Sequence, residues 1–162
     1  MGTRHHVALE NQAYFVTARM AHGMPLFRDR TVAELFLHEL QRCQERLGFL
    51  LLSFVVMPDH VHLLLVPGSS AHLSRVMQHI KGGFARLLNV ARGSSGAVWQ
   101  QRFFEAAART EVQLERWISY IQENPVKGRL AATPSAYPFS SAGGVLTADL
   151  ERYLGGEVAV PG

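Results

Sequence analysis

Two apolar segments separated only by Pro58 and Asp59 constrain the fold of this chain more than any other feature. Residues 49–57 read FLLLSFVVM and residues 60–66 read HVHLLLV. Each segment has the length of a strand and is far too short to span a bilayer. Because a Pro-Asp pair is typical of a tight turn, the two segments predict an antiparallel hairpin. The first segment does not alternate between apolar and polar residues, which predicts burial on both of its faces.

Further strands and helices are expected on both sides of this hairpin. Residues 13–20 predict a strand, and a helix follows with Thr31 as its N-cap and Gly48 at its end. After the hairpin, the pattern predicts a helix from Ser70 or Ala71 that is weakened at Gly82-Gly83, a strand within residues 98–109, and a helix from Thr110 to about Glu123 that Pro125 would end.

The predicted fold class is α+β, with the element order β-α-β-β-α-β and an added helix. This is the split-βαβ or ferredoxin-like order, here with an antiparallel sheet that carries the two long helices on one face. The other face or the end of the sheet would then be free for the third helix and for a substrate. Residues 1–162 are expected to form a single domain, with a mostly irregular tail after about residue 130. Because many unrelated proteins share this scaffold, the fold alone assigns no function.

The charge balance and the cysteine content narrow the functional classes. The chain has 16 basic and 13 acidic residues, and this mild surplus does not by itself indicate nucleic-acid binding. Apart from Lys81 and Lys127, the basic residues are arginines, which suits bidentate phosphate contacts but equally fits a genomic bias. A single cysteine, Cys43, excludes a disulfide within the chain. Together with the lack of a long apolar segment, this predicts a cytoplasmic protein that does not contact the membrane.

His60 and His62 are the first candidates for chemistry. They lie two residues apart on a predicted strand, so both imidazoles point to the same side of the sheet. They follow the turn directly and interrupt apolar runs, where a polar side chain is unexpected. Two converging imidazoles are a natural beginning of a divalent metal site, although the spacing leaves a metal-free, partly buried pair open. A hard cation such as Mg²⁺ or Mn²⁺ would also need oxygen ligands.

Tyr120 and Asn124 form a second candidate pair on the helix that begins at Thr110. They are four residues apart, so the phenol and the amide would project together from the edge of the apolar face. The amide oxygen would suit a metal, and the phenol oxygen would suit attack on a phosphate. The spacing alone favours a structural reading, in which the hydroxyl of Tyr120 is hydrated and Asn124 ends the helix before Pro125.

Four segments of the chain together carry a family resemblance. MPDHVHLLLVP, the Lys81-Gly82 step, VWQQRFF and WISYIQENPVKGRL, in this order, resemble the IS200-like single-tyrosine transposases. The likeness is greatest to the branch associated with repetitive extragenic palindromes (REP), and it runs from about Tyr14 to Ser141. The resemblance implies an HUH endonuclease that uses Mg²⁺ or Mn²⁺, with His60, His62 and Asn124 as metal ligands and Tyr120 as the nucleophile.

The resemblance also implies a substrate and a reaction. The implied partner is single-stranded DNA with a small imperfect hairpin beside the cleavage point. Tyr120 would form a 5′-phosphotyrosine and release a 3′-hydroxyl, and a 3′-hydroxyl of another strand would reverse the reaction. Asp59 stands where Asn is frequent in the family, and residues 106–108 are alanines where a larger polar residue is expected. A homodimer with shared active sites and a monomer both stay open.

Several basic residues are candidates for DNA contacts, because hairpin recognition requires phosphate ligands as well as base readers. They are Arg19, Lys81, Arg86, Arg102, Arg109 and Lys127. Trp99 and Phe103 would stack on unpaired bases or pack in the core. Two other functions remain as alternatives: a domesticated module that binds hairpin DNA without cutting it, and a metal-dependent hydrolase in which the histidine pair activates water.

Overall fold

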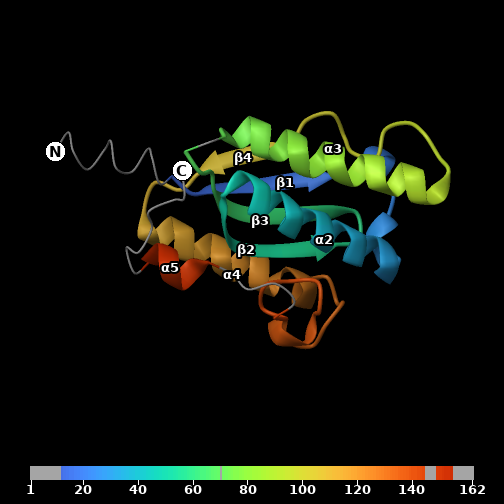
Figure 1. Cartoon of the computed structure of the whole chain (residues 1–162). Helices are drawn as coiled ribbons and strands as arrows, with labels where there is room; N and C mark the ends of the chain where they lie inside the picture. The colour runs from blue at the N-terminus through green and yellow to red at the C-terminus, as the bar shows by residue number, and fades with distance from the viewer. Residues whose placement is uncertain (1–11, 70, 145–148, 155–162) are drawn as a thin grey trace.

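A four-stranded antiparallel sheet organises the part of the chain that the computed structural model describes, residues 12–69, 71–144 and 149–154. The strands lie in the order β2-β3-β1-β4, as Figure 1 shows. The elements in chain order are β1 (Tyr14–Arg19), α2 (Arg30–Leu47), β2 (Leu50–Met57), β3 (His60–Val66), α3 (Leu73–Arg92), β4 (Phe104–Ala107), α4 (Glu111–Lys127) and α5 (Leu150–Leu154), with short 3-10 turns at Ala21–Gly23, Leu26–Arg28 and Pro134–Ala136. The predicted mixed α and β structure with an antiparallel sheet is confirmed.

The predicted hairpin is also confirmed. β2 and β3 pair in an antiparallel register that starts at Met57 opposite His60, and every residue of β2 is buried. The register shifts between Leu51 and Ser53. Because of this bulge, Leu52 and Val55 reach the same face of the sheet although they are three residues apart. Both faces of β2 are therefore apolar, as its sequence predicts.

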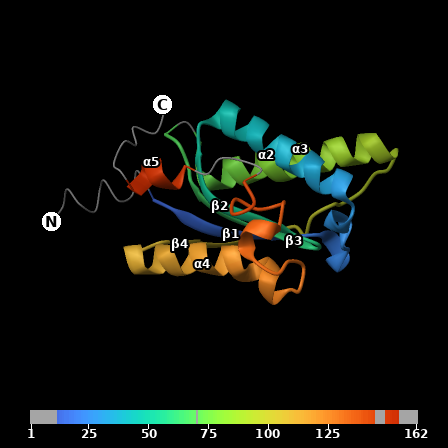
Figure 2. The same ribbon diagram turned by 90° about the horizontal axis from the view of Figure 1, so that it is seen from below.

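The helices cover the two faces of the sheet unequally. Helices α2 and α3 pack together on one face, over a core that includes Phe36, Phe54 and Phe84. Helix α4 lies on the opposite face, where Leu114 and Ile121 pack in a second apolar cluster (Figure 2). Because strand side chains alternate, Val61 joins the α2–α3 core, while His60 and His62 point to the side of α4. In the described part of the chain, no helix combines the length and apolarity needed to cross a membrane.

Two helix starts differ from the sequence prediction. The N-cap of α2 is Asp29 rather than Thr31, because the Asp29 carboxylate accepts a hydrogen bond of 2.9 Å from the Thr31 backbone N–H. Helix α3 begins at Leu73 with His72 as its N-cap, slightly later than predicted from Ser70 or Ala71. Ser70 itself lies outside the described residues.

The predicted end of the third helix at about Glu123 is wrong, because α4 continues through Pro125 to Lys127. Proline lacks only the N–H that would reach the carbonyl of Ile121, and it occupies the last turn of the helix, where its buried ring adds apolar contact. The Gly128 N–H then donates 2.9 Å to the Asn124 carbonyl and closes the helix. Asn124 therefore lies within the helix, one turn after Tyr120, and does not terminate it.

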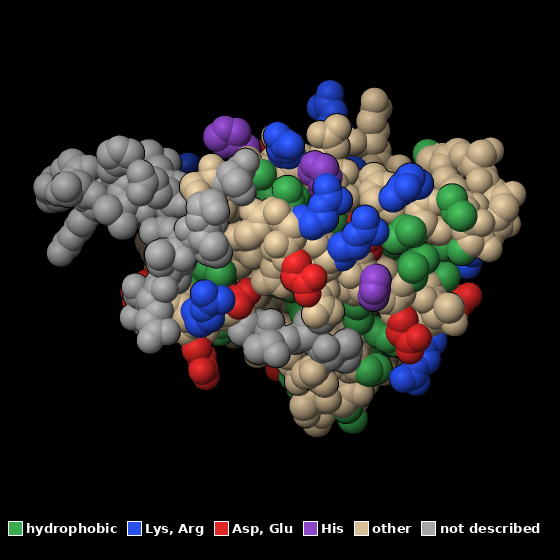
Figure 3. Space-filling view, viewed as in Figure 1, with side chains coloured by type: hydrophobic (Ala, Val, Ile, Leu, Met, Phe, Trp, Pro, Cys, Tyr) green, Lys and Arg blue, Asp and Glu red, His purple; other side chains and the backbone are tan. Residues whose placement is uncertain are grey.

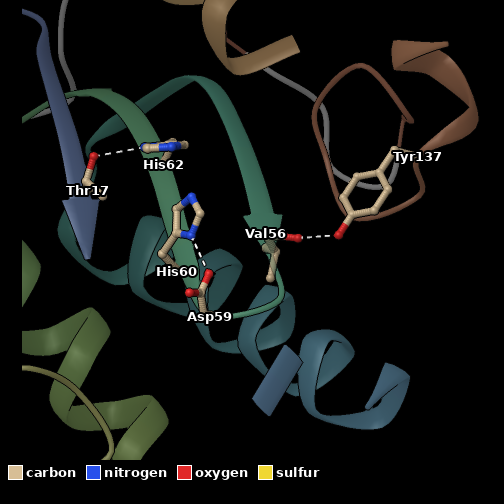
Figure 4. A network of polar contacts seen from close by, with 6 residues as sticks. All are labelled: Thr17, Val56, Asp59, His60, His62 and Tyr137. Atoms are coloured by element: carbon tan, nitrogen blue, oxygen red, sulfur yellow. Dashed lines mark hydrogen bonds and ion pairs between the residues drawn. The ribbon is translucent and has the colours of Figure 1, made fainter. Parts of the chain in front are cut away.

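The tail after residue 130 is largely irregular, as predicted, but it packs against the outer edge of β2. Ser140 forms an isolated bridge with Val55, and the Tyr137 hydroxyl donates to the Val56 carbonyl (Figure 4). Farther along, the Asp149 carboxylate accepts a hydrogen bond of 3.1 Å from the Leu51 N–H. These contacts satisfy backbone groups that an edge strand would otherwise expose. The composition of the tail does not reveal this function.

Gly82 and Gly83 do not interrupt α3, although they weaken a helix by intrinsic propensity. A Cβ added at Gly83 would lie 3.0 Å from Cδ of Glu39 and still closer to its Oε1. A Cβ at Gly82 would meet no atom within 4 Å. Gly83 therefore lies against the buried Glu39 side chain of α2, whereas Gly82 faces open space.

This difference makes the two glycines a matched pair of stability probes. Gly82→Ala should raise the free energy of unfolding by about 0.5–1 kcal/mol, because alanine loses less conformational entropy in a helix. Gly83→Ala should lose this gain or reverse it, because the buried Glu39 side chain cannot move aside freely. Urea denaturation of both variants tests this, and an equal gain at the two positions would contradict the proposed close contact.

Candidate active site

The two histidines lie at the start of β3 with their rings close together. The His60 and His62 ring centroids are 4.7 Å apart, and the ring planes are inclined at 75°. Both side chains lie on the face of the sheet that α4 covers, as the strand period predicts. The turn at Pro58-Asp59 places this pair at one end of the sheet, next to Arg19 and Thr17 of β1 in the strand register.

His62 is the buried member of the pair, with 3% of its surface exposed. Its Nδ1 is 2.9 Å from the Thr17 hydroxyl (Figure 4), while its buried Nε2 has no hydrogen-bond partner among the described residues. Burial, with the positive charges of His60 and Arg19, lowers the pKa of His62 to about 3. The ring is therefore neutral at physiological pH and carries one proton. When this proton lies on Nδ1 and is donated to the Thr17 hydroxyl, the buried Nε2 has a free lone pair for a cation.

His60 is more accessible and is oriented by its neighbour Asp59. The Nδ1 of His60 is 2.7 Å from a carboxylate oxygen of Asp59. Burial alone would raise the pKa of Asp59, but the hydrogen bond and positive charge of His60 and the charge of Arg19 together lower it. An ionised carboxylate only accepts hydrogen bonds, so Nδ1 of His60 carries a proton, and in the neutral form of the ring Nε2 is the nitrogen with a lone pair. The charge of the Asp59 carboxylate makes this orienting contact stronger than one from a neutral amide.

Tyr120 reaches the histidine pair from α4. Its ring centroid is 5.4 Å from that of His62 at an inclination of 68°, and 45% of its surface is exposed. Phe15 of β1 supports this arrangement, with ring centroids 5.2 Å from His62, 6.0 Å from Tyr120 and 5.4 Å from Trp117. The aromatic packing fixes the position of the ring, while the exposure leaves the phenol edge in contact with solvent.

A pocket of about 670 Å³ opens between the sheet and α4 at this point. Its polar lining includes Thr17, Arg19, His62, Arg116 and Tyr120. Its apolar lining is formed by Phe15, Phe104, Ala106 and Trp117. Phe104 is 60% exposed, which is unusual for a large aromatic side chain. The pocket thus combines two guanidinium groups, a neutral imidazole, a phenol and an exposed aromatic face.

Besides Phe15, Ala106 and Trp117, three residues of this pocket, Thr17, Arg116 and Phe104, are not predicted as site residues from the sequence. Thr17 is directly opposite His62 in the strand register, so strand pairing would have identified it once β1 and β3 were aligned. Arg116 lies four residues before Tyr120, a spacing that places both on one side of the helix. The sequence singles out Phe104 only as part of the VWQQRFF motif, because a sequence does not show whether an apolar side chain is exposed.

Asn124 is partly buried on α4, one turn beyond Tyr120. Within residues 12–69, 71–144 and 149–154, no group of three or more His, Cys, Asp and Glu side chains could hold a metal ion. The set predicted from the sequence contains two imidazoles and one amide, so it is not a group of that kind.

The structure does not bring the six predicted DNA-contact residues together. Arg19 lines the pocket, and Lys127 is exposed in the last turn of α4. Lys81 lies on α3 of the opposite face, where burial lowers its pKa and its Nζ donates a 2.9 Å hydrogen bond to the Gln100 carbonyl. Arg86 is also on α3, whereas Arg102 and Arg109 are exposed on either side of β4. Of the two aromatic candidates, Trp99 is buried in the α2–α3 core.

Comparisons with known proteins identify the family to which this chain belongs. Residues 10–124 match the family described as transposase IS200 like. The chain therefore belongs to the IS200-like transposase family, as the sequence resemblance predicts.

The relatives are similar over most of this chain. A REP-associated tyrosine transposase of Escherichia coli (strain K12) is 27% identical over 112 residues, covering 68% of this chain and 65% of the relative. A relative from Haemophilus influenzae, described under the same class, is 29% identical over 111 residues and 62% of each chain. The solved structure of a REP-associated tyrosine transposase bound to a REP hairpin is 25% identical, with a TM-score of 0.68, and covers 82% of this chain and 77% of that one. The chain thus spans less than two thirds of the length of the two curated relatives.

The lowered pKa of His62 predicts a specific pH dependence of stability in the metal-free protein. Between the ordinary pKa of 6.5 and about 3, the unfolded chain binds a proton at His62 that the folded chain does not bind. The difference in proton binding at His62 therefore lowers the free energy of unfolding as the pH falls, by up to ~1.4 kcal/mol per pH unit. Urea denaturation in the presence of a chelator should show this slope as a difference between the wild type and His62→Gln.

Nuclear magnetic resonance provides the direct check on the same residue. The His62 ring signals should stay those of a neutral imidazole down to pH 4.5. A titration of these signals near pH 6.5 would contradict the burial of the ring.

Proposed function

We propose that this protein is a metal-dependent single-stranded DNA endonuclease and strand transferase that cleaves next to DNA hairpins through a 5′-phosphotyrosine. The observation that carries the proposal is the position of Tyr120. Its ring lies 5.4 Å from the buried His62, at a pocket that also contains Arg19 and Arg116. A half-exposed phenol beside a neutral imidazole whose Nε2 has no hydrogen-bond partner in the described structure suits nucleophilic attack on a bound phosphodiester. Membership of a transposase family supports this reaction class.

The residues present fit a divalent cation. The buried Nε2 of His62 lacks a hydrogen-bond partner in the described structure, and Asp59 orients His60 so that its Nε2 is a lone-pair donor. We propose that these two nitrogens and the Asn124 amide oxygen hold Mg²⁺ or Mn²⁺, with water and a substrate phosphate as the remaining ligands. When bound, the cation would polarise the scissile phosphate and neutralise the charge that develops on it. The Thr17 hydroxyl would orient the His62 ring.

The protein groups then perform a transfer without a redox or nucleotide cofactor. Arg19 and Arg116 hold the phosphates of the strand by bidentate hydrogen bonds, and Phe104 and Trp117 offer faces for unpaired bases. The Tyr120 oxygen attacks the scissile phosphorus and its proton passes to solvent. The new phosphotyrosine bond replaces the bond to the 3′-oxygen, which takes up a proton and leaves as a hydroxyl. A 3′-hydroxyl of a second strand reverses these steps and joins the strands.

Two features of the fold support this assignment. The strand order β2-β3-β1-β4 with all neighbours antiparallel agrees with a ferredoxin-like arrangement of the sheet. Tyr120 and His62 approach each other within one chain, which favours a site that does not borrow its tyrosine from a second subunit. The hairpin in the proposed substrate is supported by the similar solved structure, which is bound to a REP hairpin.

Loss of the phenol hydroxyl should abolish covalent chemistry. Wild-type protein incubated with Mn²⁺ and a labelled single-stranded hairpin oligonucleotide should give a protein–DNA adduct on a denaturing gel. Tyr120→Phe should give none, a loss of at least about 1,000-fold, because no other group replaces the nucleophile. Tyr14→Phe is the matched control, since Tyr14 packs on the opposite face of the sheet and its variant should retain the adduct.

The same experiment separates the alternative functions. Cleavage that persists in Tyr120→Phe would indicate a metal-dependent hydrolase that uses water, and would refute the proposed mechanism. Tight binding of the hairpin by the wild type without any cleavage would instead identify a non-cleaving DNA-binding module.

The Thr17 hydroxyl provides a test of the proposed metal site that does not rely on cleavage. Thr17→Val preserves the shape of the buried side chain but removes the partner of His62 Nδ1, so Mn²⁺ affinity should fall about 10–100-fold. Thr17→Ser retains the hydroxyl and should bind Mn²⁺ nearly as well as the wild type. Calorimetric titration of both variants measures the effect. Equal affinities for the valine and serine variants would show that Thr17 does not orient the ligand.

A further inference from the structure

A second concave surface lies on the face of the sheet opposite the active-site pocket. It is a groove of about 650 Å³ between α2 and α3, and its charged lining consists of Glu39, Arg42, Arg46, Arg75, His79 and Arg86. Figure 3 shows Lys and Arg side chains gathered over these two helices. The proposed cleavage reaction uses none of these residues at the phosphate that is cut.

The charge of this groove, which we call the arginine groove, is dominated by the guanidinium groups. Glu39 is 4% exposed, accepts a hydrogen bond from the Cys43 thiol and is 3.8 Å from Arg42. Its carboxylate is therefore set into the floor, where it holds Arg42 and is covered from solvent. Arg75 and Arg86 are exposed and form no ion pair with another described residue. Their charge is available to a ligand.

The spacing of these residues fits an extended polyanion better than a small one. Arg75, His79 and Arg86 follow one stripe of α3, which spans ~16 Å at 1.5 Å per residue. On α2, Arg42 and Arg46 form a parallel row one turn apart. Between the rows, Gly82 carries no side chain and a Cβ there would meet no atom within 4 Å, so the helix surface is open to a ligand backbone at this point. Successive phosphates of one strand would meet successive guanidinium groups along such a groove.

The neutral lining also favours a nucleic acid over a lipid surface. Ser74 and Gln78 are hydrogen-bonding groups of the kind that bind phosphate and sugar oxygens. None of the residues that line the groove is a large hydrophobic residue. A helix face that enters a bilayer interface needs such residues next to its basic ones. The concave shape also favours a nucleic acid, because a chain of phosphates can lie within the groove.

We propose that the arginine groove binds the phosphate backbone of a DNA segment outside the active site, on the opposite side of the sheet from the strand that Tyr120 attacks. The proposal rests on the proposed function for the identity of the polyanion as DNA. It implies that one substrate reaches around the molecule or that a second DNA segment is held while the first is cut. Phosphate contacts of this kind provide affinity and orientation without reading sequence.

Two pairs of substitutions that remove equal charge test the proposal. Arg75→Ala/Arg86→Ala removes two exposed charges from the groove, and Arg28→Ala/Arg30→Ala removes two exposed charges elsewhere. Binding of a labelled hairpin oligonucleotide with a long single-stranded extension is measured by fluorescence anisotropy over a series of salt concentrations. The groove variant should bind about 5–20-fold more weakly, and the slope of log affinity against log salt should decrease by about 1.5. The control variant should retain the affinity and slope of the wild type.

The outcome is independent of whether the protein cleaves DNA. At saturating DNA, the groove variant should form the Tyr120 adduct at the wild-type rate, while Tyr120→Phe should retain the wild-type salt slope. If the wild type forms no adduct but the salt slopes of the two arginine pairs differ as predicted, the proposed reaction is refuted and the arginine groove is still supported as a DNA-binding site. Equal slopes for the two arginine pairs would overturn the groove proposal. Loss of binding to anionic vesicles without loss of DNA binding would also overturn it, in favour of a membrane surface.

Discussion

Burial of the β2–β3 hairpin on both faces is the constraint on which the rest of the structure depends. Every residue of β2, and all of β3 after His60, is buried. Such strands are stable only when both faces of the sheet are covered. Helices α2 and α3 cover one face, α4 covers the other, and the tail through Tyr137 and Ser140 protects the outer edge. The position of α4, and with it that of Tyr120, therefore follows from the need to bury β2 and β3.

The histidine pair is where this rule of burial is broken. His62 takes an inward position in an otherwise apolar strand, and its Nε2 finds no partner in the described structure. Leaving a buried polar atom unpaired costs about 1–3 kcal/mol. Burial also keeps the ring neutral, as the pKa of about 3 indicates. A buried ring nitrogen without a hydrogen bond, on an imidazole that stays neutral, fits a ligand for a cation better than it fits a structural role. Asp59 likewise orients the His60 ring.

The sequence predicts those parts of the fold that depend on the spacing of residues within a single strand or helix. The hairpin, the common side of His60 and His62, and the shared edge of Tyr120 and Asn124 all follow from spacings along one strand or one helix. The rest depends on pairing between distant segments. Thr17 belongs to the site only because β1 pairs with β3, and the tail covers β2 through contacts that its composition does not encode. Pro125 was expected to end α4, but its missing N–H costs little in the last turn.

DNA contacts are harder to predict from the sequence than the hairpin is. The positions of charged residues along the chain show no periodicity that would indicate on which face of the molecule each one lies. Arg19 and Arg86 look equivalent in the sequence, yet Arg19 lines the candidate active-site pocket and Arg86 lines the arginine groove on the opposite face. On α4 the situation differs, since Arg116, Tyr120 and Asn124 recur at intervals of four residues and so lie on one stripe. Tyr120 of this stripe lies against His62, and Arg116 lines the same pocket. A single helix thus presents a guanidinium, a phenol and an amide in series, and its placement by apolar burial brings the phenol to the histidine pair.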